Sequence, residues 1–184
     1  GGGVVDNGSV FLGANGLTGE IGHTLVDTSS SALTCQCGAT GCLEAMASGT
    51  GIERIARQKV ASGDFSESVL AELDAGSLDS EAVFDAAGKN DPLAMSIVAG
   101  AVSALAIGLT NVVHLFNPDM IVLGGGVTQG LVKLDLLPRI DQGIRERTMS
   151  ELHKEFQLTS ARLGDSVGLA GAAALVWDQL AAEG

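Results

Sequence analysis

The chain has 184 residues, of which 46% are hydrophobic and 26 are glycine, whereas aromatic residues make up 3% and tyrosine is absent. This is enough for one domain with a sizeable core, packed by Ala, Val, Leu and Ile in the manner of α/β proteins. The formal net charge of -12 repels phosphate backbones, so we expect no nucleic-acid contact through this domain.

The start of the chain lacks the basic-then-apolar order of a signal peptide, and three unevenly spaced cysteines do not form a disulfide framework. We therefore expect a reducing, cytoplasmic setting. The chain opens on "GGGVVDNGSVFLG" without a starting methionine or an element leading into its glycines. We expect it to be part of a longer protein, with the missing part upstream.

The first half of the chain contains a short hairpin signature and then helical patterns. Apolar residues on both sides of Asp6-Asn7-Gly8 predict two strands joined by a tight turn. Apolar spacing from Leu43 to Ala61 predicts a helix that is broken near Gly49 and Gly51. The acidic segment 62–91 predicts short helices and turns on a solvated surface.

The segment from Pro92 to Pro118 contains no Asp, Glu, Lys or Arg, which raises the question of a membrane span. Polar residues recur along one face every seven positions, from Ser96 to Asn117, and no basic or aromatic anchors flank the segment. We predict a buried helix of a soluble domain and no membrane contact.

The last third alternates strands and helices. "IVLGGGV" predicts an apolar strand that ends on Gly124 to Gly126, and helix is expected from about Leu131 to Met149. "EFQLTSA" predicts a second strand, and an Ala-rich helix is expected from about Gly168 to Ala182. This alternation predicts parallel pairing in an α/β sheet, within a single domain over residues 1–184.

All three cysteines fall in one short loop. Cys35, Cys37 and Cys42 form a C-x-C-x4-C pattern in which Gly38 and Gly41 allow the backbone to bend, as in zinc knuckles. His23, twelve residues upstream, is the nearest histidine and completes a Cys3His set. Ordinary buried thiols are the alternative, and a disulfide would require an oxidising compartment. A closed Cys3His site has a structural and not a catalytic role.

Two glutamates bracket this loop. Glu44 follows Cys42 and is equally explained by the preference for acids in the first turn of a helix, and Glu20 is equally explained as a turn residue. Beside a rigid metal site, however, two carboxylates and an imidazole are suitable acceptors for the hydroxyls of a sugar.

Two triple-glycine runs, Gly1 to Gly3 and Gly124 to Gly126, lack the G-K-[ST] of a Walker A loop and the spacing of the dinucleotide fingerprint. A strand that ends in glycines before a helix allows close approach to a nucleotide, but a tight strand-to-helix turn explains it equally well.

Together, "GEIGH", "CQCGATGCLE" and "NPDMIVLGGGV" resemble the ROK family of repressors, open reading frames and kinases, over essentially the whole chain. "CLEAMASGTGIERIAR" is most similar to the ATP-dependent glucokinases. The resemblance implies an actin-like (ribonuclease H-like) ATPase fold, in which this chain is the C-terminal large domain of a homodimeric protein and the N-terminal small domain is missing.

The resemblance also implies roles for individual residues. His23, Cys35, Cys37 and Cys42 would bind Zn2+, while Glu20, His23 and Glu44 would bind sugar hydroxyls. ATP with Mg2+ would lie between the two glycine runs, which consist of Gly1, Gly2 and Gly3 and of Gly124, Gly125 and Gly126.

The family's Asp base and its D-x-G-x-T motif belong to the N-terminal domain, so no catalytic residue is expected in this chain. Thr18 and Ala39 depart from the usual Ala and Asn of the family. We predict part of a hexose kinase that phosphorylates the sugar 6-hydroxyl. The alternative is the sugar-effector domain of a ROK repressor with an upstream helix-turn-helix, and a fragment without activity of its own is a third possibility.

Overall fold

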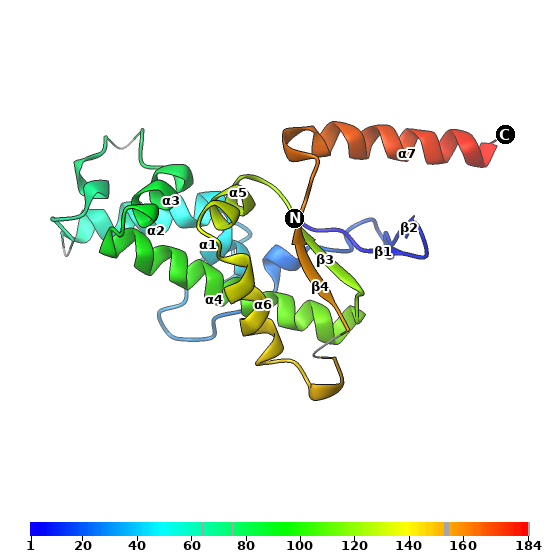
Figure 1. Ribbon diagram of the computed structural model, residues 1–184, viewed down its shortest axis with the longest axis horizontal. Helices are drawn as coiled ribbons and strands as arrows, with labels where there is room; N and C mark the ends of the chain where they lie inside the picture. Colours follow the sequence, from blue (N-terminus) through cyan, green and yellow to red (C-terminus); the bar gives the residue numbers. More distant parts are fainter. Residues whose placement is uncertain (64, 75, 153–154, 184) are drawn as a thin grey trace.

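The computed structural model describes residues 1–63, 65–74, 76–152 and 155–183. In chain order its elements are β1 (Val5–Asp6), β2 (Ser9–Val10), η1 (Ile21–His23), α1 (Leu43–Ala47), α2 (Gly49–Ser62), η2 (Val69–Glu72), α3 (Ser80–Gly88), α4 (Pro92–Phe116), β3 (Met120–Leu123), α5 (Gly126–Lys133), α6 (Leu137–Arg145), η3 (Ser150–Leu152), β4 (Gln157–Ser160), η4 (Gly164–Ser166) and α7 (Val167–Glu183). Helices α1 to α6 gather on one side of the molecule, and the strands lie on the other with the N-terminus beside β3 and β4 (Figure 1).

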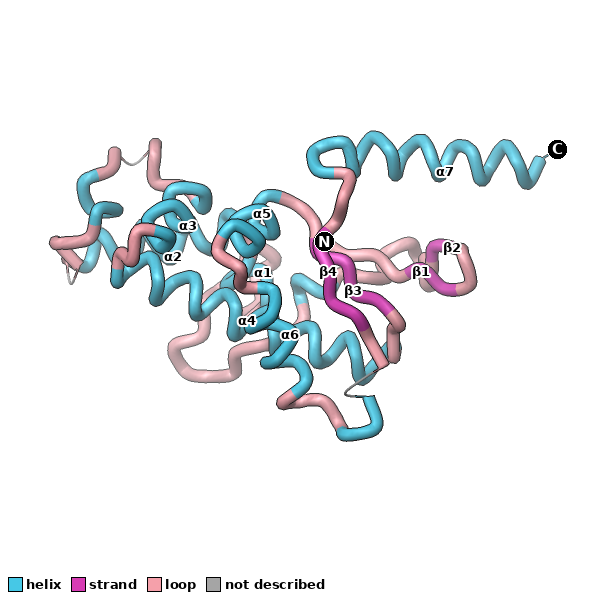
Figure 2. Tube along the Cα trace, viewed as in Figure 1, coloured by secondary structure: helices cyan, strands magenta, loops and turns pink. Residues whose placement is uncertain are grey.

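Two small sheets confirm the predicted strands. β1 pairs antiparallel with β2, and the turn between them places Asn7 and Gly8 at φ 48° and 79°, the left-handed conformation that the Asn-Gly pair predicted. β3 pairs parallel with β4, from Met120 opposite Gln157 to Leu123 opposite Ser160, and α5 and α6 form the crossover. The chain is therefore α/β, although its helices far outweigh its strands (Figure 2).

Two helix boundaries differ from the sequence prediction. Helix was expected as one stretch from about Leu131 to Met149, but α5 already begins at Gly126 and α6 is separate. Asp135, at φ 52°, turns the chain between them, and Pro138 lies in the first turn of α6, where its missing N–H is tolerated. The predicted break before Gly49 is confirmed: Ser48 is extended and caps α2.

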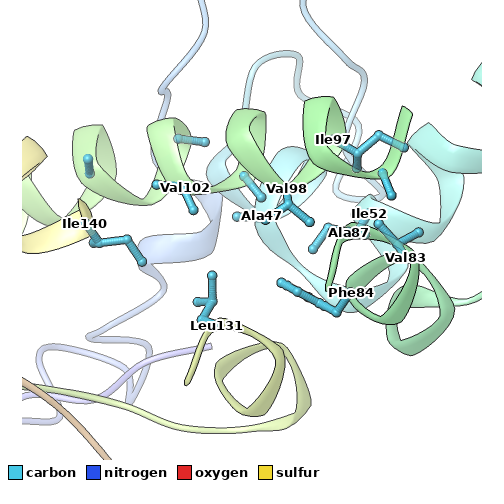
Figure 3. Close-up of a cluster of buried hydrophobic side chains, with 14 of the residues drawn as sticks. Ala47, Ile52, Val83, Phe84, Ala87, Ile97, Val98, Val102, Leu131 and Ile140 are labelled. Atoms are coloured by element: carbon cyan, nitrogen blue, oxygen red, sulfur yellow. The ribbon is translucent and has the colours of Figure 1, made fainter. Parts of the chain in front are cut away.

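The core forms where α4 crosses the other helices. Side chains of α4 point toward Ile52 of α2, Phe84 of α3, Leu131 of α5 and Ile140 of α6 (Figure 3). Ile52 and Ile140 are fully buried, and complete burial of such a side chain contributes about 1.5–3 kcal/mol. By length and composition α4 could cross a membrane, but 61% of its most apolar window is buried in the protein, which identifies it as a core helix.

The acidic segment 62–91 is only partly the solvated surface that its charge predicted. Glu67, Glu72 and Glu81 are exposed, as expected. Leu70 of η2 and Phe84 of α3 are nevertheless buried in the core, where α3 packs an apolar face against α4. The high charge density of this segment therefore predicted its exposed face correctly but gave no information about the residues that it buries.

The buried Asp91 carboxylate ties this segment to α4. It caps α4 by accepting a hydrogen bond from Ala94 N at 2.9 Å. It also accepts bonds from Ser68 Oγ and Val69 N, both at 2.9 Å. Burial alone raises the pKa of Asp91, but these hydrogen bonds to its charged form outweigh that effect and lower the pKa below the ordinary value.

The predicted C-terminal helix is present as α7, but it lies apart from the helical body (Figure 1). The apolar side chains of its part up to Trp177 are largely exposed, with Leu169 at 79% and Trp177 at 75%. Met120 and Val122 on one face of β3 are also about half exposed. An apolar helix with uncovered faces is typical of a surface that packs against another segment or subunit.

Candidate metal centre and ligand cleft

The loop that carries the cysteines is held by backbone hydrogen bonds. Cys35 N donates to Ala39 O at 2.7 Å, and Gly41 N donates to Leu33 O at 2.8 Å. Gly38 and Gly41 adopt φ of 90° and 84°, so the prediction that glycines bend this loop is confirmed. The bend turns the three sulfur atoms toward one point.

The four predicted ligands, His23, Cys35, Cys37 and Cys42, converge. Their ligand atoms all lie within 4.8 Å of one another. The Cys37 and Cys42 Sγ atoms are 3.7 Å apart, and Cys35 Sγ is 3.8 Å from His23 Nδ1. Tetrahedral zinc with Zn–S bonds of about 2.3 Å requires S–S separations of about 3.8 Å. The residues therefore fit a tetrahedral metal ion.

The protonation of the thiols differs within this cluster. Burial, reinforced by the neighbouring thiols, raises the pKa of Cys42 to about 12. A backbone hydrogen bond near Ala39 and the neighbouring thiols lower the pKa of the exposed Cys37. A metal ion binds thiolates, so binding at this site must release the Cys42 proton, which makes metal affinity fall in acid.

The predicted sugar-binding residues surround the cluster but do not all face one hollow. Glu44, in the first turn of α1, has Oε1 3.7 Å from Cys35 Sγ. His23 presents Nδ1 to the cluster, and its Nε2 lies 3.9 Å from Glu20 Oε2. Only Glu44 of these three lines the large cleft described next. Glu20 and His23 lie at its margin, next to the cleft-lining residues Gly19 and Gly22.

The cleft, of about 1400 Å³, brings together segments more than 100 residues apart in sequence. Its lining includes Gly1 and Gly3 from the first glycine run, all of Gly124 to Gly126, and Glu44. Gly2 is not among the lining residues and packs instead against the carbonyl of Gly19. Gly1, Gly3 and Gly124 to Gly126 thus line the same cavity, an arrangement that nucleotide binding between the two glycine runs would require.

The start of α5 makes one wall of this cleft suited to an anion. Gly125, at φ 89°, directly precedes the helix, and backbone N–H groups of a first helical turn attract phosphate. Thr128 also lines the cleft, with its Oγ1 donating to Gly124 O at 2.9 Å. Sequence reasoning missed Thr128, for which the only signal was its place in the first turn after the glycines.

Comparison with known proteins reveals extensive similarity. Residues 1–179 match the sequence model of the ROK family. The chain is 37% identical over 179 residues to a glucokinase of Halalkalibacterium halodurans, covering 97% of this chain and 53% of that protein. It is 31% identical over 176 residues to the DNA-binding transcriptional dual regulator NagC of Escherichia coli, covering 96% of this chain and 41% of the regulator.

Among solved structures, a ROK family glucokinase from Streptomyces griseus in complex with glucose and AMPPNP aligns with a TM-score of 0.76 at 28% identity. The alignment covers 94% of this chain and 55% of the glucokinase chain. The actin-like ATPase fold expected from the sequence is thereby confirmed. The chain spans about half the length of the curated relatives it matches, which include both kinases and transcriptional regulators.

Proposed function

This chain belongs to the ROK family, and we propose that it is the large, C-terminal domain of an ATP-dependent hexose kinase of the glucokinase type. The observation that carries the proposal is the shared cleft. It contains the glycines suited to a nucleotide, Gly124 to Gly126, together with the carboxylate of Glu44 beside the Cys3His cluster.

In the proposed arrangement, His23, Cys35, Cys37 and Cys42 hold a structural Zn2+. The ion fixes the loop, and with it the position of Glu44, whose carboxylate contacts Cys35. Coordination through Nδ1 of His23 leaves Nε2 as an oriented partner for a sugar hydroxyl, next to Glu20. These residues bind and orient the hexose, which lowers the entropic part of the barrier.

The glycines of the cleft bind the nucleotide. Gly1, Gly3 and Gly124 to Gly126 let backbone approach the phosphates, and the N-terminus of α5 favours their negative charge. ATP with Mg2+ supplies the transferable phosphoryl group and the neutralisation of its charge. The base that deprotonates the sugar 6-hydroxyl is an Asp of an N-terminal domain outside these 184 residues.

We further propose that this N-terminal domain packs against α7 and the exposed face of β3. The support is the uncovered apolar surface around Leu169, Trp177 and Val122, and the half of the curated relatives' length that this chain does not match. The protein is expected to be a cytoplasmic homodimer, and a surface with net charge -12 leaves this domain without a nucleic-acid role.

Kinase assays test the proposal directly. The full-length protein, given glucose and ATP, is expected to form glucose 6-phosphate, whereas these 184 residues alone are expected to show no turnover. Glu44→Gln should raise the KM for glucose and leave the fold unchanged. Phosphorylation by the isolated chain would place the base within it and overturn the assignment of the base upstream.

A second function is supported by the match to the regulator NagC. In that case the same cleft and metal loop bind a sugar effector, and the upstream part is a DNA-binding helix-turn-helix. Sugar binding without ATP-dependent phosphorylation, together with sugar-dependent DNA binding by the full-length protein, would establish this alternative.

A further inference from the structure

A second, smaller hollow lies between the cysteine loop and the start of α2. It has a volume of about 300 Å³, and its lining includes Gln36 of the loop and Arg54 and Arg57 of α2. Glu44 and Ser48 line both this hollow and the cleft, so the two adjoin. We propose that this hollow, which we name the arginine pocket, binds a phosphate group at a site distinct from the glycines of the cleft.

The two guanidinium groups carry the first part of the argument. Arg57 Nη2 is paired with Glu53 Oε1 at 2.8 Å, but its Nε is buried without a hydrogen-bond partner. Arg54 has a buried, unpartnered Nε too, and among the residues that the structure describes it has no ion pair. Buried donors of native proteins are nearly always satisfied, so such groups indicate an ion, water or ligand.

Phosphate satisfies these groups better than a smaller anion does. An oxyanion bound to an arginine accepts from two N–H groups of the guanidinium together, which suits the two arginines that line this pocket. Several acceptor oxygens and up to two negative charges allow one phosphate to bridge Arg54 and Arg57. The volume of about 300 Å³ is at the small end of ligand pockets and suits a phosphate monoester of a small alcohol.

The first turn of α2 adds donors of the same polarity. The helix has 14 residues, and its positive end lies at the pocket, where Ser48, Thr50 and Gly51 contribute to the lining. The hydroxyls of Ser48 and Thr50 are 3.1 Å apart, with Ser48 Oγ already accepting from Gly51 N. Hydroxyl and helix N-terminus thus stand beside Arg54 as further partners for an oxyanion.

The two acidic residues of the lining do not neutralise Arg54. Glu53 is bound to Arg57. Glu44 has one carboxylate oxygen 3.7 Å from Cys35 Sγ, and its other oxygen lies next to Gly22, which lines the cleft. Arg54 thus keeps its positive charge unpaired by the two carboxylates of the pocket lining, which favours an anion there.

Calorimetric titration of the zinc-loaded protein with inorganic phosphate tests the proposal. Glucose and a non-hydrolysable ATP analogue are present, so that the sites in the cleft are filled, and ionic strength is held constant with chloride. Saturable binding is expected with a Kd of order 1 mM. Glycerol 3-phosphate in a second titration distinguishes a pocket for phosphate esters, which it will also fill, from a pocket for free phosphate alone.

Arg54→Ala is expected to weaken phosphate binding about tenfold. Arg54→Lys is expected to weaken it less, because lysine keeps the positive charge but lacks the paired N–H groups of the guanidinium. The matched control is Arg139→Ala, which removes an exposed arginine of α6 and should leave the Kd within about twofold. Thermal unfolding without phosphate identifies any loss of fold, in which case Arg54→Gln replaces the alanine variant.

Equal phosphate affinity in Arg54→Ala and Arg139→Ala would overturn the proposal, as would an absence of saturable binding by the unsubstituted protein. Neither result bears on the proposed kinase activity, because the assay for glucose 6-phosphate does not depend on the arginine pocket. Conversely, failure of the kinase assay leaves the comparison of the two arginine variants intact.

Discussion

Replacement of Gly41 by alanine should weaken the metal centre much more than replacement of Gly38, although both glycines lie in the same loop. Each adopts a positive φ, which costs an alanine about 1–2 kcal/mol. A Cβ at Gly38 would meet nothing within 4 Å. A Cβ at Gly41 would collide with the backbone carbonyl oxygen of Asp27.

Relief of that collision requires the loop to open around Gly41. Its N donates to Leu33 O at 2.8 Å, and its O accepts from Val26 N at 2.9 Å and from Asp27 N at 3.2 Å. Loss of two of these bonds adds about 2 kcal/mol to the cost. If loop folding and metal binding are coupled, this difference corresponds to about 30-fold in metal affinity between the two variants.

Chelator competition for zinc in the two variants measures this difference, with the thermal unfolding of the metal-loaded proteins as the second readout. We expect about tenfold weaker zinc binding for Gly38→Ala, and a further 30-fold loss for Gly41→Ala. Equal zinc affinities of Gly38→Ala and Gly41→Ala would show that the collision at Gly41 does not weaken the site, since the two variants differ only in what surrounds the added Cβ.

Three further predictions concern the rest of the chain. Asp91→Asn should lower the free energy of unfolding by about 1–2 kcal/mol near pH 7. The difference in this free energy between the two proteins should persist above about pH 4 and vanish as the pH falls through the lowered pKa of Asp91. Urea titrations at several pH values measure it. Gly130→Ala should destabilise the fold by about 1–3 kcal/mol, measured by calorimetry, because its Cβ would collide with the ring of Phe84. Trp177, the one tryptophan of these 184 residues, should fluoresce at solvent-exposed wavelengths in the isolated chain, and its contribution to the full-length protein, obtained by difference from Trp177→Phe, should be shifted to the blue; an unshifted contribution would contradict the proposed packing on α7.

The convergence of the four candidate metal ligands was predictable because its determinants are local. His23 and the three cysteines lie within 20 residues of one another. Gly38 and Gly41 predict the bend of the loop, and their positive φ angles confirm it. Three of the four ligands share one short loop and His23 lies at the end of the nearby η1, so their convergence depends little on the rest of the fold. The hairpin was predictable for the same reason, since Asn7 and Gly8 specify its turn.

Features that depend on packing between distant elements were not predictable. The turn between α5 and α6 places Asp135 at a positive φ, which an aspartate adopts without a glycine to signal it. The arginine pocket exists only because α2 and the cysteine loop leave a hollow, and the spacing of Arg54 and Arg57 does not reveal that. The Ala-rich composition likewise predicted α7 as a helix, but not that the apolar side chains of its described part are exposed.

In the proposed function, one metal-bound loop holds the sugar-binding side chains in place. The most direct test is glucose binding by the full-length protein, measured by calorimetry before and after removal of zinc, with His23→Ala beside His114→Ala as the matched control. His114 lies outside the cluster and accepts a hydrogen bond from Met149 N. We expect one zinc per chain, and loss of glucose binding on chelation and in His23→Ala, with recovery on zinc addition only where His23 is present. Unchanged glucose affinity in metal-free, folded protein would contradict it.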